Sequence, residues 1–223
     1  MLEFKIIVLG VLQGITEFLP ISSSGHLVIF GHIFNITNDN IVTEVILHFG
    51  TLISILIYFR KDIGELIMGI VRRRSEESLY AFNIFIATFP IVFFSLFVKD
   101  FLGDIFSINT LLYTYLINAF ILFSTKYFRV NGTVISTQVA IIIGCAQMFA
   151  LLPGISRAGI TICTGLILGC ARRDVAKFSF FMAIPALIGA IFFELGNIIR
   201  VAQFDVMALV LGFTVSMITG LIF

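Results

Sequence analysis

The amino-acid sequence predicts an all-α integral membrane protein: a polytopic helical bundle containing two re-entrant helical hairpins. Three observations predict this class. Of the 223 residues, 59% are hydrophobic and only 12% are charged, whereas a soluble domain carries about 25% charged residues. Apolar runs of about 20 residues, the length that crosses a bilayer, recur along the chain. Two further apolar runs are interrupted by helix breakers and polar side chains.

Five apolar segments have the length of a membrane span. They cover about residues 41–59, 80–98, 107–128, 177–199 and 204–223. The first interrupted segment runs from about 2 to 35 and breaks at Pro20–Gly25, and the second runs from about 135 to 171 and breaks at Pro153–Gly159. Non-helical backbone at membrane depth is tolerated only where protein buries it or where it lines a cavity. Both interrupted segments are therefore predicted to be re-entrant hairpins.

The basic residues test this topology, because cytoplasmic loops carry an excess of Lys and Arg. If each hairpin returns to the side it entered, ten basic residues fall on one side: Arg60, Lys61, Arg72, Arg73 and Arg74 flanking the first loop, Lys126 and Arg129, and Arg172, Arg173 and Lys177. Lys5, Lys99 and Arg200 fall on the other side, and Arg157 lies within the membrane. The pattern predicts a multi-pass membrane protein whose first hairpin opens outward and whose second hairpin opens to the cytoplasm.

A weak internal repeat has an offset of about 133–134 residues. Gly10-Val11-Leu12-Gln13 matches Gly144-Cys145-Ala146-Gln147, and Leu19-Pro20 matches Leu152-Pro153. One membrane domain, residues 1–223, would then consist of repeat 1 (about 1–130) and an inverted repeat 2 (about 131–223), with the site at their interface near the midplane. Chance similarity between Leu/Ile-rich segments is the alternative.

The repeat predicts three spans in each copy, but the second copy shows only two before Phe223. The last transmembrane helix is therefore expected to be absent from this chain. Its empty position would expose an apolar groove, which membrane lipid or a partner would fill. A homodimer is one such partner arrangement.

Polar residues of the first break offer the parts of a catalytic site: Gln13, Glu17, Ser22, Ser23, Ser24, Gly25 and His26. Gln13 and Glu17 are four residues apart and share one helix face. Serine hydroxyls at a helix start cap free backbone N–H groups, and glycine permits close approach of a ligand or of another backbone. A carboxylate, a hydroxyl and an imidazole within one turn are typical of covalent catalysis. A capped helix with a structural histidine is the alternative.

The second break has the parts of a phosphate site. Pro153-Gly154 interrupts the helix, Ser156 can cap the next helix, and Arg157 follows near its N-terminus, with Thr161 one turn on. A guanidinium fork beside free N–H groups at a helix N-terminus favours phosphate or pyrophosphate. An arginine that only pairs with Glu17 for structure is the alternative.

These stretches resemble a known family. Residues 13–27 read Gln-Gly-Ile-Thr-Glu-Phe-Leu-Pro-Ile-Ser-Ser-Ser-Gly-His-Leu and residues 153–161 read Pro-Gly-Ile-Ser-Arg-Ala-Gly-Ile-Thr. Both are similar to the signatures of undecaprenyl-pyrophosphate phosphatase, the bacitracin-resistance family, and the likeness covers nearly the whole chain. The resemblance implies hydrolysis of a polyprenyl pyrophosphate lipid to its monophosphate at the outer face of the membrane. This reaction recycles the lipid carrier for cell-wall glycans and needs a divalent cation, Mg²⁺ or Ca²⁺.

The resemblance also implies roles for single residues. Glu17 matches the second acid of the family's Glu-x-x-x-Glu motif, Ser23 and His26 match its catalytic serine and histidine, and Ser156, Arg157 and Thr161 match its pyrophosphate-binding segment. From their place at the two helix breaks, Ser22, Ser24, Gly25 and Gly154 are expected to add substrate contacts. Gln13 stands where the first glutamate is usual, so the expected metal ligands are Glu17 and Gln13. Glutamine removes one negative charge at this position, which puts the affinity for the metal in question. Ala158 stands where a serine is usual.

Three questions stay open at this level. Either Ser23 or His26 could be the nucleophile. Glu44, His48 and Glu194 could line the cavity or only make helix contacts. A polyprenyl-phosphate flippase or transporter without phosphatase activity is the second functional hypothesis, because inverted repeats with broken helices suit alternating access. Nucleic acid is not an expected partner, since no basic patch interleaved with aromatic residues occurs.

Overall fold

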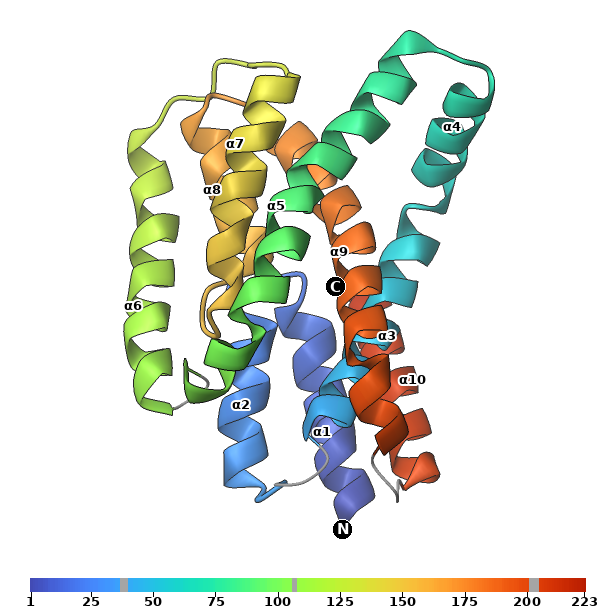
Figure 1. Ribbon diagram of the computed structural model, residues 1–223, viewed down its shortest axis with the longest axis vertical. Coiled ribbons are helices and arrows are strands. Elements are labelled where there is room, and N and C mark those ends of the chain that lie inside the picture. The colour runs from blue at the N-terminus through green and yellow to red at the C-terminus, as the bar shows by residue number, and fades with distance from the viewer. Residues whose placement is uncertain (37–39, 106–107, 201–204) are drawn as a thin grey trace.

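The computed structural model describes residues 1–36, 40–105, 108–200 and 205–223 (Figure 1). This part of the chain is a helical bundle without β-strands. Its helices are α1 (Leu2–Thr16), α2 (Ser23–Ile33), α3 (Asn40–Tyr58), α4 (Arg60–Val71), α5 (Ser75–Ile105), α6 (Ile108–Ser124), α7 (Thr137–Gln147), α8 (Arg157–Ile167), α9 (Arg172–Arg200) and α10 (Val206–Ile222), with short 3-10 helices η1 (Thr125–Tyr127) and η2 (Met148–Leu151).

Both interrupted segments form helical hairpins, as predicted. α1 and α2 run up and down beside each other, as do α7 and α8, and the two hairpins come from opposite ends of the molecule so that their turns face each other in the middle (Figure 1). Serine caps explain where the second helix of each hairpin begins. The Ser22 hydroxyl accepts from Gly25 N at 3.3 Å, and the Ser156 hydroxyl accepts from Gly159 N at 3.0 Å.

The five predicted spans are all helices, although not all are equally long. Ser75–Phe97 of α5 and Arg172–Phe192 of α9 are long and apolar enough to cross a membrane, and a third candidate is the pair Val42–Tyr58 and Arg60–Val71, which is bent by 71°. α6 and α10 have 17 residues each, or about 26 Å of helix at 1.5 Å per residue. That length is at the lower limit of a span.

The prediction of a loop after the first span is wrong for residues 60–71, because these residues form α4. The helical spacing of its apolar residues could have indicated α4, since Ile63 and Leu66 pack against the buried cluster around Phe178. An ion pair between Asp62 and Lys177 of α9 also holds α4 in place. Only a short turn before Ser75 then connects α4 to α5.

Seven of the ten basic residues that the sequence grouped on one side lie on or beside three connections at one end of the molecule, whereas Arg60 and Lys61 begin α4 and Lys177 lies within α9. The turn between α4 and α5, the connection from η1 to α7 and the turn between α8 and α9 all lie at the top of Figure 1, whereas the N-terminus lies at the bottom. These three connections carry Arg72–Arg74, Lys126 with Arg129, and Arg172 with Arg173. The side chains of Lys99 and Arg200 lie outside the described part of the structure.

Small residues bring α10 close to α1 and α3, as is usual for helix packing in membranes. A Cβ added to Gly10 would lie 2.9 Å from Gly212 O, and one added to Gly14 would lie 2.8 Å from Ser216 O. The Ser216 hydroxyl donates to Leu47 O at 2.8 Å and so ties α10 to α3. This packing fixes the two helices that carry Gln13, Glu17 and His48.

Candidate active site

The two hairpin turns are joined by hydrogen bonds in the centre of the bundle. We call residues 17–22 the first tip and residues 148–156 the second tip. Gly154 N of the second tip donates to the Ser22 hydroxyl of the first at 3.1 Å. Ser22 adopts φ 65°, a strained conformation for a non-glycine residue of the kind that gathers at functional sites.

One side chain of α6 bridges both tips. Asn118 Nδ2 donates to Pro20 O of the first tip at 3.0 Å, and Asn118 Oδ1 accepts from Ser156 N of the second tip, also at 3.0 Å. The neighbouring Thr114 hydroxyl donates to Pro153 O at 2.5 Å. α6 therefore aligns the tips, a role that neither motif indicates and that the sequence analysis missed.

Glycines allow this close approach. Gly154 has φ +95°, and a Cβ there would lie 2.1 Å from Thr114 Oγ1. A Cβ on Gly25 would lie 2.6 Å from Tyr115 Oη and 3.1 Å from the Cα of Gly154. Both predicted substrate-binding glycines thus pack against protein and lie outside the lining of the cavity described next.

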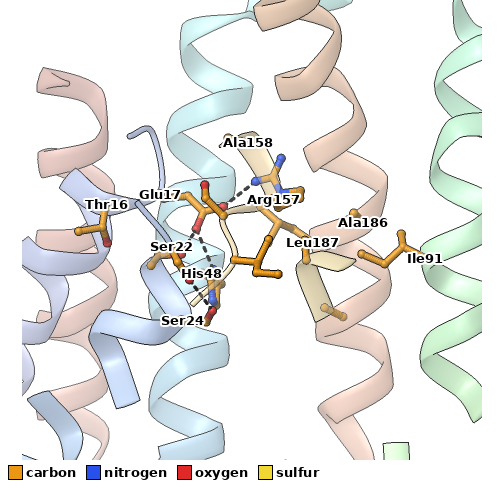
Figure 2. Close-up of a pocket in the computed structure, with 15 residues that line it drawn as sticks. Thr16, Glu17, Ser22, Ser24, His48, Ile91, Arg157, Ala158, Ala186 and Leu187 are labelled. Atoms are coloured by element: carbon orange, nitrogen blue, oxygen red, sulfur yellow. Dashed lines mark hydrogen bonds and ion pairs between the residues drawn. The ribbon is translucent and has the colours of Figure 1, made fainter. Parts of the chain in front are cut away.

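A cavity of about 200 Å³ lies between the tips and the helices around them (Figure 2). Its polar wall consists of Thr16, Glu17, Ser22, Ser23, Ser24, His48, Ser156 and Arg157, and its apolar wall consists of Ile91, Ala150, Ile155, Ala158, Ala186, Leu187 and Ala190. Six of the predicted site residues therefore line the cavity, and a seventh, Gln13, lies beside it and contacts Glu17. His26, Gly25, Gly154 and Thr161 do not line it.

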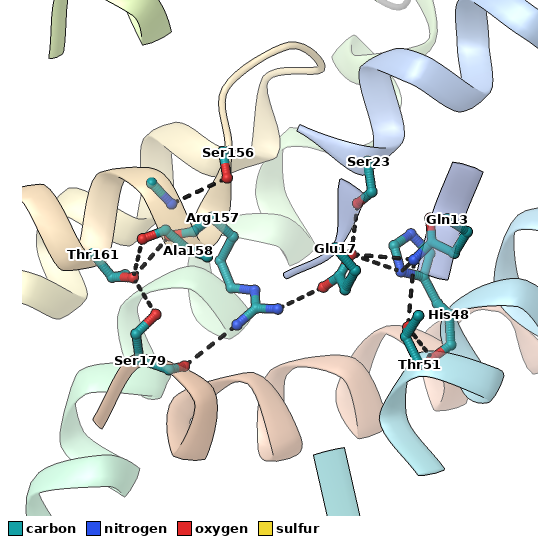
Figure 3. A network of polar contacts seen from close by, with 11 residues as sticks. Gln13, Glu17, Ser23, His48, Thr51, Ser156, Arg157, Ala158, Thr161 and Ser179 are labelled. Carbon is teal, nitrogen blue, oxygen red and sulfur yellow. Dashed lines mark hydrogen bonds and ion pairs between the residues drawn. The ribbon is translucent and has the colours of Figure 1, made fainter. Parts of the chain in front are cut away.

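Glu17 is the centre of the polar network (Figure 3). The Ser23 hydroxyl donates to its Oε2 at 2.5 Å, and Arg157 Nη2 donates to its Oε1 at 2.6 Å. Gln13 Nε2 also donates to Oε2, at 3.1 Å, and His48 Nδ1 lies 3.5 Å from the same oxygen. The predicted carboxylate, hydroxyl and guanidinium are therefore in direct contact, from two segments far apart in sequence.

Arg157 is held from its other side by α9. Its Nη1 donates to Ser179 O at 3.4 Å, and the Ser179 hydroxyl lies 2.7 Å from the Thr161 hydroxyl. Thr161 is fully buried, so it supports the position of Arg157 through Ser179. Ser179 was not predicted as a site residue, because it is a single serine within an otherwise apolar span.

His26 points elsewhere than the sequence led us to expect. Its Nδ1 lies 2.7 Å from Ser22 O and 2.9 Å from Tyr115 Oη on α6. The imidazole beside Glu17 belongs instead to His48 of α3, one of the three residues left open above. Because a carbonyl oxygen only accepts, the contact with Ser22 O is a hydrogen bond in the tautomer that carries its proton on Nδ1, and in that tautomer Nε2 can accept a hydrogen bond. Of the other two open residues, Glu44 is half-buried outside the cavity lining, and the Glu194 side chain lies outside the described part.

Two helix N-termini complete the polar wall. α2 begins at Ser23 and α8 begins at Arg157, and both residues line the cavity. The first N–H groups of a helix have no intrahelical acceptor, and the helix dipole adds positive potential there. The cavity is therefore suited to an anion with several oxygens, balanced in this structure by the Glu17 carboxylate.

Comparison with known proteins agrees with this geometry. The family model described as "Bacitracin resistance protein BacA" matches residues 6–223. The chain belongs to the BacA family. A protein named undecaprenyl-diphosphatase from Methanococcus maripaludis is 39% identical over 97% of this chain and 86% of its own length. Proteins of the same name from Caldicellulosiruptor bescii and Acinetobacter baumannii are 38% and 35% identical, over 99% and 98% of this chain and 85% and 83% of theirs.

Membership of the BacA family, together with the apolar helices, makes the chain a multi-pass membrane protein. Its described residues contain no group of three or more His, Cys, Asp or Glu side chains that could hold a metal ion. Gln13 nevertheless has its Oε1 buried and without a hydrogen-bond partner in the described structure. In this BacA-family chain, Glu17 and Gln13 thus offer one carboxylate and one amide oxygen, and a cation would need further oxygens from substrate or water.

Proposed function

We propose that the protein hydrolyses undecaprenyl pyrophosphate, or a related polyprenyl pyrophosphate, to the monophosphate and phosphate. This reaction recycles the lipid carrier for cell-wall synthesis. The observation that carries the proposal is the direct contact of Ser23 and Arg157 with the two oxygens of Glu17. The relatives named undecaprenyl-diphosphatase support the same activity.

Arg157 and the N-termini of α2 and α8 would bind the pyrophosphate oxygens. Spreading the charge of the transferred phosphoryl group is the main task of a phosphoryl-transfer enzyme. A phosphate group beside Arg157 competes with Glu17 for the guanidinium. Substrate binding would therefore weaken the Glu17–Arg157 pair and leave the carboxylate free to accept a proton from Ser23.

In the mechanism that the contacts favour, Ser23 is the nucleophile and Glu17 is its base. The Ser23 hydroxyl proton passes to Glu17 while Oγ forms a bond to the terminal phosphorus. The bond from that phosphorus to the bridging oxygen breaks, and polyprenyl monophosphate leaves with the electron pair. Water then attacks the phosphoserine and releases phosphate, which regenerates the Ser23 hydroxyl. Attack by Nε2 of His26 is the competing mechanism and would give a phosphohistidine.

A divalent cation, Mg²⁺ or Ca²⁺, fits the donor set only in part. Glu17 and Gln13 would hold it, and the unpartnered Gln13 Oε1 is the observation that supports this assignment. When bound, the ion supplies additional positive charge for phosphate oxygens. Mg²⁺ is commonly held by one or two carboxylates together with substrate phosphates and water, which agrees with the small number of protein ligands, whereas Ca²⁺ would take more oxygens from substrate and water.

The same proposal covers topology. The hairpins would be re-entrant and related as an inverted repeat, with the basic end of the bundle in the cytoplasm and the cavity opening to the outer face of the inner membrane. The opposed hairpins of Figure 1 and the basic connections at one end support this arrangement. Proteins with inverted repeats place their sites at such a repeat interface.

Phosphate release from undecaprenyl pyrophosphate by the purified protein in detergent tests the activity. We expect release that a chelator reduces and that Arg157→Lys lowers strongly, since Lys lacks the planar fork. Binding of the lipid by well-folded protein without any release would overturn the hydrolase and favour the flippase or transporter. No feature of the described structure favours that second function.

A further inference from the structure

The apolar wall of the cavity is the part that the chemistry of a phosphate site does not explain. Four of its members come from two long helices: Ile91 from α5, and Ala186, Leu187 and Ala190 from α9. Figure 2 shows Ile91, Ala186 and Leu187 on the side of the cavity opposite Ser22 and Ser24. One continuous cavity therefore has a charged end at Glu17 and Arg157 and an apolar end between α5 and α9.

This apolar end reaches the surface of the bundle. Ala186 is half-buried, whereas Ala190, one helical turn further along α9, is exposed. The adjacent outer surface is apolar too: Val92 on α5 is 41% exposed, and Phe192 on α9 is 69% exposed. In a multi-pass membrane protein, exposed apolar side chains of this kind face lipid. The cavity is thus continuous with a lipid-facing surface.

Size limits what the cavity can enclose. Pockets that enclose a drug-sized ligand have about 300–1,000 Å³, and this cavity has about 200 Å³. It can hold a pyrophosphate with the carbons next to it, but not a long polyprenyl chain. Most of that chain must leave the cavity, and the only favourable surroundings for it are apolar.

We infer that Ile91, Ala186, Leu187 and Ala190 form the binding site for the first isoprene units of the substrate, and that the chain leaves between α5 and α9 at Ala190 into the lipid. The inference rests on the proposed function and assigns its lipid subsite. Ala186 and Ala190 are four residues apart and so share one face of α9. Their single methyl groups leave the space that an isoprene unit fills.

Two variants and a matched control test the subsite. Ala186→Phe and Ala190→Phe fill the apolar end, whereas Ile188→Phe adds the same ring on α9 at a position that is exposed and outside the cavity lining. Each protein is assayed with a long-chain polyprenyl pyrophosphate and with methyl pyrophosphate, which has no isoprene unit. We expect KM for the long-chain substrate to rise by roughly tenfold or more in the two Ala variants, as for lost apolar pocket contacts. KM for methyl pyrophosphate should change much less than KM for the long-chain substrate in the two Ala variants, and Ile188→Phe, outside the lining, should match wild type on both substrates.

The possible results separate this inference from the proposed function. Wild-type protein that releases phosphate from neither substrate contradicts the proposed function. Active wild type with an unchanged long-chain KM in Ala190→Phe overturns the lipid subsite alone.

A second measurement covers variants that fail to fold. Wild-type protein is photolysed with a polyprenyl pyrophosphate that carries a diazirine on its first isoprene unit. Label on residue 91 or on residues 186–190 supports the subsite, and label confined to α2 or α6 overturns it.

Discussion

Glu17 and Arg157 stand 140 residues apart in the chain, yet their side chains form an ion pair of 2.6 Å. Only 6% of the Glu17 side chain and 14% of the Arg157 side chain are exposed. The pair connects the end of α1 to the start of α8 and so makes one site out of two broken helices. Each charge also offsets the cost of burying the other, which gives Arg157 a role in folding as well as in binding.

Removing one partner of this pair should destabilise the protein. Arg157→Met leaves the Glu17 carboxylate buried without its guanidinium, a change that typically costs about 3–5 kcal/mol. The double variant Glu17→Gln/Arg157→Met removes both charges and should recover part of that loss. Reversible unfolding in mixed micelles measures the difference. As a control, Arg74→Met breaks the exposed pair with Glu77 and should cost about 0–1 kcal/mol; equal losses at both sites would contradict the role of the buried pair.

Ser23→Ala should abolish phosphate release while leaving the fold intact. Loss of a nucleophile that acts with its base typically lowers kcat by about 10⁴–10⁶-fold. Ser24→Ala is the matched comparison, because Ser24 also lines the cavity but its hydroxyl pairs with Ser22 at 3.3 Å. It should change KM more than kcat. Acid quenching of a wild-type reaction identifies the nucleophile independently: an acid-stable phosphoserine is expected, and an acid-labile phosphoenzyme that survives in Ser23→Ala would point to His26.

Asn118→Ala should loosen the contact between the two tips. It removes the donor to Pro20 O and the acceptor for Ser156 N, and leaving buried polar groups unsatisfied costs about 1–3 kcal/mol each. We expect a lower melting temperature and a lower kcat, because Ser23 directly follows the first tip and Arg157 directly follows the second. Leu116→Ala on the exposed face of α6 is the control and should leave kcat unchanged. A variant with reduced stability but wild-type kcat would show that Asn118 does not align the site.

Gly154→Ala should be among the most damaging single substitutions. Its φ of +95° is strained for alanine, and the new Cβ would lie 2.1 Å from Thr114 Oγ1. Backbone strain alone costs about 1–3 kcal/mol. Gly64→Ala in α4 is the control, since nothing lies within 4 Å of its Cβ position, and there alanine should stabilise by roughly 0.4–1 kcal/mol. Thermal unfolding in detergent compares them, and a harmless Gly154→Ala would mean that the second tip can shift away from α6.

Much of this fold was predictable because helix-breaking residues in apolar sequence have few interpretations. Pro20, Gly25, Pro153 and Gly154 located both hairpin turns, and the charge pattern grouped three of the connections at one end of the molecule. α4 was missed because its many charged residues resemble those of a loop, whereas its helical spacing of Ile63 and Leu66 becomes meaningful only once a core exists for them to pack against.

The site was predictable where its chemistry is unusual at membrane depth, as for Glu17, Ser23 and Arg157. Asn118 and Tyr115 were not, and His48 stayed an open candidate, because single polar residues on otherwise apolar helices carry no signal of which contacts they make. The direction of His26 could not be predicted either. Ser23 and His26 share a turn of α2, but the His26 ring turns toward Tyr115 on α6, which lies 89 residues further along the chain.

Gln13→Glu should make the stability of the protein depend on divalent cations. Gln13 Nε2 now donates to Glu17 Oε2 at 3.1 Å, and a carboxylate in its place sets two negative charges against each other. A proton or a cation must then lie between them. We expect the melting temperature of Gln13→Glu to fall in chelator and to recover in Mg²⁺ or Ca²⁺, with a smaller response in wild type.

Gln147 supplies the control for that experiment, because the predicted repeat aligns it with Gln13. Gln147 is equally buried, but neither of its side-chain polar atoms has a hydrogen-bond partner in the described structure. Gln147→Glu therefore buries a carboxylate for which the described structure shows no acidic partner. This variant should be less stable than wild type whether or not a cation is present. If both variants respond to Mg²⁺ and Ca²⁺ alike, the cation acts on the protein as a whole and Gln13 is not a ligand. If only Gln13→Glu responds, the position beside Glu17 is the place where a cation would bind.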